Sequence, residues 1–257
     1  EELMRLLNDV LAAWGISDAK DLSWLDLPPD TAIENARELL VMLGALDRSG
    51  RITSHGKKMV RSGLHPRLSH MVIKAQKKGF GYTGVRLSAM LMEKDILLHD
   101  PMAYEPDVHD RLDMLSQYEK GVAFSGGYLK ADKKRIRRVL ESEKKIAKDM
   151  GIKDRHIDTE TAGSLLAFAY PDRICKKRSS GQKTYLSAGG KGVCFKEETP
   201  LSKHEYIVAV HLDGNPRNAK VFLGAPYSRH ELERDFSELI TKETALLWDD
   251  TAKEVKQ

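Results

Sequence analysis

The sequence predicts a multidomain α+β fold, in which a winged helix is followed by a helical bundle and a small OB-like β-barrel. Three observations lead to this prediction: apolar residues at helical spacing through most of the first 169 positions, β-rich runs separated by glycines after Pro171, and a length of 257 residues. A chain of that length can form one large domain or two to three small ones.

The first 64 residues have the pattern of a winged helix. Apolar residues at helical spacing predict an amphipathic helix over residues 3–14, and Thr31 with Glu34 has the form of a capping box that opens a second helix. The stretch 47–53 contains a turn glycine and a short apolar run, which predict a small hairpin, the wing. A third helix is expected from Ser54 to about residue 63.

Residues 65–169 predict a helical bundle. Pro66 suits the first position of a helix that stops at Gly79. Two prolines between residues 96 and 108 predict a loop there. Further helices are expected over 83–92, 129–150 and 160–168.

From residue 170 onward, short β-rich runs alternate with turn residues. Strands are expected over 184–187, 193–195, 206–212 and 221–223, followed by an amphipathic helix over 228–240 and a last strand over 245–248. Four or five short strands with one helix suggest a small barrel, for which the OB-fold is the first candidate. The expected domains are therefore 1–64, 65–169 and 170–257.

The motifs of several enzyme classes are missing. The two Gly-Lys pairs, at 56–57 and 190–191, lack the first glycine of the phosphate-binding motif G-x-x-x-x-G-K-[ST]. His65 and His70 are five residues apart and diverge on a helix, and no C-x-x-C or H-E-x-x-H motif accompanies them. G-x-S-x-G is absent as well. We therefore expect no catalytic residue, no metal and no cofactor site in this chain.

Cysteine usage and hydropathy indicate the compartment. Two cysteines are too few to stabilise a chain of this length by disulfides, which is typical of a reducing compartment and suggests the cytoplasm. No apolar run approaches the roughly 18 residues of a membrane span, and no secretory signal is visible. Because the sequence begins with Glu1 within a helical pattern, we expect it to be part of a longer protein.

The basic residues are concentrated on one predicted helix face, although the 42 basic side chains barely outnumber the 38 acidic ones. At about 100° per residue, eight cations of the helix expected over 129–150 share an arc of about 140° and a stripe about 27 Å long, with Glu141 as the one acid inside it. Such a stripe can bind phosphates without reading bases, although a solvated face kept soluble by lysines has the same pattern. The candidate residues are Lys130, Lys133, Lys134, Arg137, Arg138, Lys144, Lys145 and Lys148.

A second basic patch opens the β-rich region. Cations between residues 173 and 196 are interleaved with Tyr185 and Phe195, and a single strand can stack on aromatic rings that lie beside cations. Phe195 is more typical of a core residue, whereas Tyr185 fits either role. The candidates taken from this patch are Arg178, Lys183 and Tyr185.

Several longer motifs, weak alone, are specific in combination. They are WLDLPP at 24–29, LLVMLGALDRSGRITSHGKKM at 39–59, HPRLSHMVIKA at 65–75, AGSLLAFAYPDRI at 162–174 and LLWDD at 246–250. In this order the motifs resemble the region that follows the motor lobes in bacterial DEAH-box ATP-dependent helicases of the HrpB type.

The resemblance implies a winged helix, a helical ratchet-like (HA2-type) domain and an OB-like domain that contact single-stranded RNA or DNA and couple motor-lobe movement to translocation. It implies that ATP and Mg²⁺ bind to the motor lobes of the same longer chain, whose Walker and DEAH motifs are not among these 257 residues. The alternative is a protein-docking module whose lysines only keep it soluble.

Overall fold

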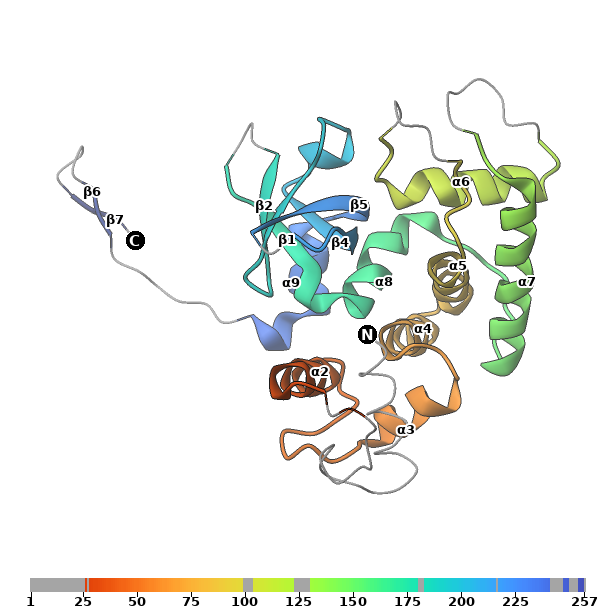
Figure 1. Ribbon diagram of the computed structural model, residues 1–257, viewed down its shortest axis with the longest axis horizontal. Helices are drawn as coiled ribbons and strands as arrows, with labels where there is room; N and C mark the ends of the chain where they lie inside the picture. The colour runs from red at the N-terminus through yellow and green to blue at the C-terminus, as the bar shows by residue number, and fades with distance from the viewer. Residues whose placement is uncertain are drawn as a thin grey trace.

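The computed structural model describes residues 26, 28–98, 104–122, 130–179, 183–215 and 217–240, together with the backbone of 247–249 and 254–256. Figure 1 shows a helical body with a β-barrel on one side and the long helix α7 on the other. The helices and the five-stranded barrel confirm the predicted α+β class. The helix predicted over 3–14 lies outside the described residues.

The winged-helix segment contains α2 (Asp30–Met42) and α3 (Ser54–Arg61), and an antiparallel bridge between Leu46 and Ile52 forms the predicted wing between them. α3 begins where the Thr53 hydroxyl accepts a hydrogen bond from a backbone N–H of its first turn. Apolar side chains of both helices and of the wing form one buried cluster beneath them.

The capping box predicted at Thr31 and Glu34 is wrong. α2 begins at Asp30, and its N-cap residue is Pro29, whose side chain cannot accept a hydrogen bond. The pyrrolidine ring holds φ of Pro29 at −55°, so the chain enters the helix without a side-chain cap.

The bundle differs from the predicted helices in two places. A helix over 108–119 was not predicted, because charged residues interrupt its apolar row. The long basic helix begins later than expected, since Asp132 caps it by accepting the N–H groups of Lys134 and Arg135. The helices are α4 (Pro66–Lys77), α5 (Gly81–Met92), α6 (Val108–Glu119), α7 (Lys133–Asp149) and α8 (Ala162–Ala169).

The barrel is closed by five strands in the order β1-β2-β3-β5-β4, with β3 and β5 parallel and the other pairs antiparallel. This confirms the small barrel expected after residue 170. β1 was not predicted, because its two lysines obscure the alternation of a strand. The strands are β1 (Ile174–Lys177), β2 (Thr184–Ser187), β3 (Gly192–Cys194), β4 (Tyr206–Leu212) and β5 (Asn218–Tyr227).

The segment after the barrel is only partly helical. α9 (Arg229–Asp235) ends earlier than the predicted helix over 228–240, and a 3₁₀ turn over Ser237–Leu239 follows it. The last predicted strand overlaps β6 (Leu247–Asp249), which pairs with β7 (Glu254–Lys256) in a separate two-stranded sheet.

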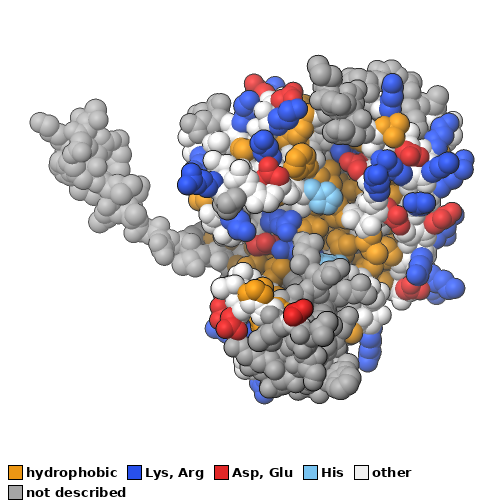
Figure 2. Space-filling view, in the orientation of Figure 1, with side chains coloured by type: hydrophobic (Ala, Val, Ile, Leu, Met, Phe, Trp, Pro, Cys, Tyr) orange, Lys and Arg blue, Asp and Glu red, His pale blue; other side chains and the backbone are white. Residues whose placement is uncertain are grey.

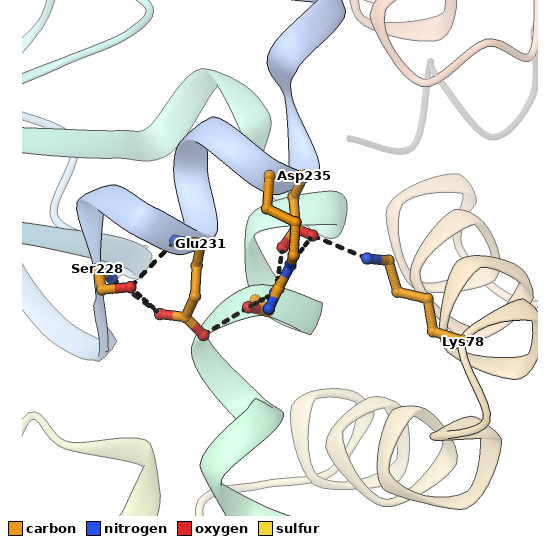
Figure 3. A network of polar contacts seen from close by, with 6 residues as sticks. Lys78, Ser228, Glu231 and Asp235 are labelled. Carbon is orange, nitrogen blue, oxygen red and sulfur yellow. Dashed lines mark hydrogen bonds and ion pairs between the residues drawn. The ribbon is translucent and has the colours of Figure 1, made fainter.

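Polar contacts attach α9 to the bundle (Figure 3). Ser228 and Glu231 form a capping box at the start of α9. The other oxygen of the Glu231 carboxylate accepts a hydrogen bond from the hydroxyl of Ser164 on α8 at 2.7 Å. At the other end of α9, Lys78 Nζ donates to Asp235 Oδ1 at 2.8 Å. The helix therefore links the barrel, whose last strand it follows, to α4 and α8.

Buried side chains form three clusters. The largest runs without a break from the bundle helices into β4 and β5, and the others lie within the winged helix and inside the barrel. The predicted domain boundary at residue 170 therefore does not coincide with a gap in the hydrophobic core. The three domain ranges stay predictions.

The close packing of α8 on the barrel depends on Gly163. A Cβ at this position would collide with the backbone carbonyl oxygen of Pro226 on β5. We expect Gly163→Ala to lower the free energy of unfolding by about 1–3 kcal/mol, because the overlap outweighs the better helix propensity of alanine. Gly214→Ala is the matched control, since its Cβ meets no atom within 4 Å. Urea denaturation measures both, and equal midpoints for the two variants would contradict the prediction.

A histidine pair joins the winged helix to the bundle. Nε2 of His55 on α3 lies 2.8 Å from Nδ1 of His70 on α4. Burial, with nearby lysines acting in the same direction, lowers the pKa of His55 to about 4, and burial together with His55 lowers the pKa of His70 to about 3. Both rings are therefore neutral at pH 7, and one donates to the other.

We expect acid to weaken this junction. The unfolded chain, with histidine pKa values near 6.5, binds protons that the folded chain excludes, so stabilisation present above pH 6.5 is lost as the pH falls towards 4. At pH 5 the loss reaches up to about 2 kcal/mol for the buried His70 and is smaller for the partly exposed His55, whose charge is screened by solvent. Urea denaturation at about pH 7.5 and pH 5 measures this loss of stability in wild type and in His70→Gln. Burial raises the pKa of Asp110 to about 6, so Asp110 contributes to the pH dependence with the opposite sign. Subtracting the loss in His70→Gln from the loss in wild type removes this contribution. An equal loss in both chains would contradict the prediction.

Candidate nucleic-acid interface

α7 has one buried side and one basic side. Its buried residues, Ile136, Val139, Glu143, Ile146 and Ala147, include those that pack against α5. Figure 2 shows Lys and Arg side chains gathered at the edge of the molecule where Figure 1 places α7. All seven predicted cations of the helix are exposed: Lys133, Lys134, Arg137, Arg138, Lys144, Lys145 and Lys148.

Lys130 is not part of this stripe. It precedes the helix cap Asp132, and its carbonyl oxygen accepts the N–H of Leu98 at 2.8 Å beside an isolated bridge to the segment after α5. The stripe therefore runs from Lys133 to Lys148 and is about 22 Å long, shorter than expected.

A buried ion pair fixes α7 on α5. Arg86 donates from Nε and Nη2 to the two carboxylate oxygens of Glu143 at 2.7 and 3.1 Å, and both side chains are almost fully buried. Arg86 also forms an ion pair with Glu119 on α6 at 2.7 Å. Burial acts to lower the pKa of Arg86, yet the two carboxylates raise it, so the guanidinium stays charged. The basic face of α7 is therefore held in one orientation.

The stripe has two flanks. On the α6 side, Arg137 donates from Nε to the Tyr118 hydroxyl at 3.0 Å. On the other side of the helix, Lys134, Arg138 and Lys145 lie within about 40° of one another. Among the residues that the structure describes, none of the seven cations has an ion-pair partner. The charges are therefore available to a ligand.

The structure separates the barrel candidates. Arg178 and Lys183 are exposed at the two ends of the connection between β1 and β2. Tyr185 is fully buried in the barrel, where its hydroxyl lies 2.9 Å from the Ser202 carbonyl and 2.8 Å from that of His204, and burial raises its pKa to about 12. The prediction that Tyr185 stacks on a strand is wrong, because the alternation of β2 points this ring into the core.

The barrel also exposes another aromatic ring and a largely apolar groove with three cations in its lining. Phe222 on β5 has 55% of its surface exposed, and Leu186 faces outward on β2. Phe222 lies between the inward-facing Val221 and Leu223. This alternation could have predicted from the sequence that the Phe222 ring faces outward. A groove of about 740 Å³ lies beside Leu186 and is lined by Ile174, Lys176, Lys177, Arg178, Tyr206 and Leu232.

We expect Tyr185→Phe to affect stability and not strand binding. Loss of the hydroxyl removes a donor from the His204 carbonyl, whereas the Ser202 carbonyl keeps Lys177 Nζ as a donor, and it should lower the free energy of unfolding by about 1 kcal/mol. Phe222→Ala is the comparison variant, since it removes an exposed ring. Thermal denaturation and fluorescence anisotropy with a labelled strand measure the two properties. Loss of binding in a folded Tyr185→Phe chain would contradict the purely structural role of the hydroxyl.

The two basic regions lie on opposite sides of the bundle (Figure 1). α7 packs on α5, α5 packs on α4 and α8, and α8 packs on β4 and β5. The predicted candidates therefore form two separate surfaces, one on α7 and one on the barrel.

Within the described ranges, neither a metal site nor a membrane-spanning helix is present. No group of three or more His, Cys, Asp or Glu side chains there could hold a metal ion. No helix in that part of the chain is long and apolar enough to cross a membrane. Cys175 and Cys194 are free thiols, and Cys175 is buried.

The winged-helix segment matches a known family. The helicase-associated domain (HA2), winged-helix, covers residues 36–61, which span most of α2, the wing and α3. A winged helix that leads into a helical bundle and a closed barrel is the arrangement expected of a helicase accessory region.

Over its whole length the chain is similar to helicases of one type. The chain is 29% identical to ATP-dependent RNA helicase HrpB of Escherichia coli (strain K12) over 257 residues, which is 99% of this chain and 28% of that protein. Two crystal structures of E. coli HrpB match 100% of this chain. The first, of a DExH-box NTPase, has a TM-score of 0.75 and 27% identity, and the match covers 28% of that chain. The second, of a DEAH/RHA helicase, has a TM-score of 0.67 and 26% identity, and the match covers 29% of that chain. The resemblance to the HrpB type is confirmed.

A second relative matches over a shorter range. Probable ATP-dependent RNA helicase DHR2 of Saccharomyces cerevisiae is 30% identical over 102 residues, which is 40% of this chain and 14% of that protein. The chain therefore spans less than a third of the length of either relative.

Proposed function

We propose that this region contacts a single nucleic-acid strand within a longer ATP-dependent helicase and couples movement of the motor lobes to translocation. The observation that carries the proposal is the row of seven exposed cations on α7, with Glu141 as the one acid between them. A row of phosphates can neutralise such a face along its length.

The packing of α7 supports this role. A stripe of like charges on one helix face costs a few tenths of a kcal/mol for each i,i+4 pair, which solubility alone does not require. The buried pair of Arg86 and Glu143 holds the helix against α5, so the backbone that carries the cations needs little ordering when a strand binds. Binding would depend on the backbone and would show little base preference.

The motor lobes of the longer protein would supply ATP hydrolysis. ATP and Mg²⁺ would be bound by motor lobes of the same longer chain, which would be partners of this region, in the cytoplasm. Both relatives are named RNA helicases, which favours RNA over DNA as the strand.

Fluorescence anisotropy with a labelled strand of about 20 nucleotides, RNA and DNA in parallel, tests the proposal at about 50 and 200 mM salt. We expect micromolar binding at the lower salt and, for about six phosphate contacts, a fall of about a thousandfold at the higher salt. An absence of binding at low salt, or an affinity that is equal at both salt concentrations, would contradict it.

A protein-docking role is the second candidate. The groove beside Leu186, about 740 Å³ and largely apolar, together with exposed Phe222, favours it. Salt-insensitive binding of a protein, with no affinity for either strand, would support docking and exclude the strand-binding role.

A further inference from the structure

A groove of about 490 Å³ lies where the C-terminal ends of α3, α4 and α7 meet. We call it the three-helix groove, and no part of the sequence analysis assigned it a role. Its volume lies within the range of small-molecule sites, so it can hold part of a nucleic-acid strand. It is lined by Lys58, Arg61, Ser62, Ile73, Gln76, Lys77, Asp149 and Met150.

The lining of the groove is positively charged. Lys58, Arg61 and Lys77 are exposed and, within the described residues, form no ion pair, while Asp149 is the one acid of the lining. The three helix ends contribute about half a negative charge each, which offsets part but not all of this charge. The positive charges of the groove also act on a neighbouring residue. Besides burial, the charges of Lys74, Lys77 and Lys58 lower the pKa of His55.

The floor of the groove is apolar. Ile73 is 7% exposed, and Met150 is half-buried against the winged-helix core. Exposed cations at the rim and an apolar floor, with the exposed amide of Gln76 also in the lining, suit a nucleotide that places its phosphate at the rim and its base on the floor. A free anion without a base would use only the rim.

The groove is continuous with one flank of the α7 stripe. On the helical wheel, Asp149 of the groove lies within about 20° of Arg138 and 40° of Lys145. Lys133, Arg137 and Lys144 lie on the far flank, where Arg137 contacts Tyr118 of α6. Figure 1 shows the C-terminal end of α7 directed towards α3 and α4, and Met150 packs against both the bundle core and the winged-helix core.

We propose that the three-helix groove is a second phosphate-binding site for the same strand, so that the strand runs along the flank of Lys134, Arg138 and Lys145 and continues past Asp149 to Lys58, Arg61 and Lys77. This inference rests on the proposed function of α7. It adds a direction to the strand path, from the bundle to the winged helix, and a contact made by the winged helix itself.

Anisotropy with two strand lengths tests the path. A strand of about six nucleotides, at about 3.4 Å per nucleotide, spans α7 alone, whereas one of about 20 nucleotides also reaches the groove. We expect Lys58→Glu/Arg61→Glu/Lys77→Glu to weaken binding of the long strand and lower its salt slope by about 2, with binding of the short strand unchanged. The far-flank variant Lys133→Glu/Arg137→Glu/Lys144→Glu carries the same change in charge. It should weaken binding of the long strand less than the variant Lys134→Glu/Arg138→Glu/Lys145→Glu does.

The outcomes separate the inference from the proposed function. We call Lys134→Glu/Arg138→Glu/Lys145→Glu the near-flank variant. If it loses binding while the variant with Lys58, Arg61 and Lys77 reversed to glutamate binds the long strand as wild type does, α7 keeps its role and the groove is excluded as a binding site. If wild type binds neither strand, or the near-flank variant is unaffected, both proposals fail. Lys58→Gln/Arg61→Gln/Lys77→Gln guards against misfolding, since it avoids placing acids at helix C-termini, and it should reproduce the lower slope.

Discussion

Reversing Lys134, Arg138 and Lys145 to glutamate should abolish binding of a single strand and leave the fold intact. All three side chains are exposed on α7, so their replacement removes no buried contact. The change removes three phosphate contacts and places three like charges beside the nucleic-acid backbone, so no binding should be measurable even at about 50 mM salt. Anisotropy with the labelled strand of about 20 nucleotides measures the binding, and circular dichroism checks the fold.

The matched control carries the same change in charge elsewhere. Lys203, Arg217 and Lys220 are exposed before β4, before β5 and on β5, away from α7. Their reversal to glutamate should weaken binding only through the net charge of the chain. Unchanged binding in the α7 variant, or an equal loss in the control, would exclude α7 as the strand-binding element.

Replacing Arg86 by methionine should destabilise the protein by about 3–5 kcal/mol, because it leaves the Glu143 carboxylate buried at 2% exposure without its cation. For a chain of this size the expected fall in melting temperature is about 6–20 °C. Because the pair holds α7 on α5, the loss should also loosen the basic face. Calorimetry or urea denaturation measures the stability.

The double variant Arg86→Met/Glu143→Met identifies the cause. Replacing both partners by apolar side chains removes the unpaired charge, so much of the lost stability should return. Glu119, which also pairs with Arg86, is partly exposed and can be solvated when that partner is removed. A single variant that loses less than about 1 kcal/mol, or a double variant as unstable as the single one, would contradict this account.

The basic surface of α7 could be predicted because it is a local property. Seven cations and an apolar row on one helix follow from 3.6 residues per turn, and the structure exposes all seven. Lys130 was misplaced because the start of a helix depends on its cap, and the side chain of Asp132 accepts the first N–H groups two residues later. The boundary of the stripe therefore depended on a single side chain.

Tyr185 and Glu143 show where local pattern was insufficient. A tyrosine among lysines fits a stacking surface as well as a core, and only the closure of the barrel decided that its ring lies inside. An acid in the apolar sector of α7 has no local explanation, because its partner Arg86 is 57 residues away on α5. Arginine in the otherwise apolar α5 was the complementary signal.

The sequence by itself determined the α+β class, the order of winged helix, bundle and barrel, and the charged face of α7, since all of these follow from periodicity and turn residues within short segments. Only the tertiary structure decided that the bundle and barrel share one core, that the two basic regions face opposite ways, and that three helix ends meet in a groove. These features depend on contacts between residues far apart in the chain, which local spacing does not encode.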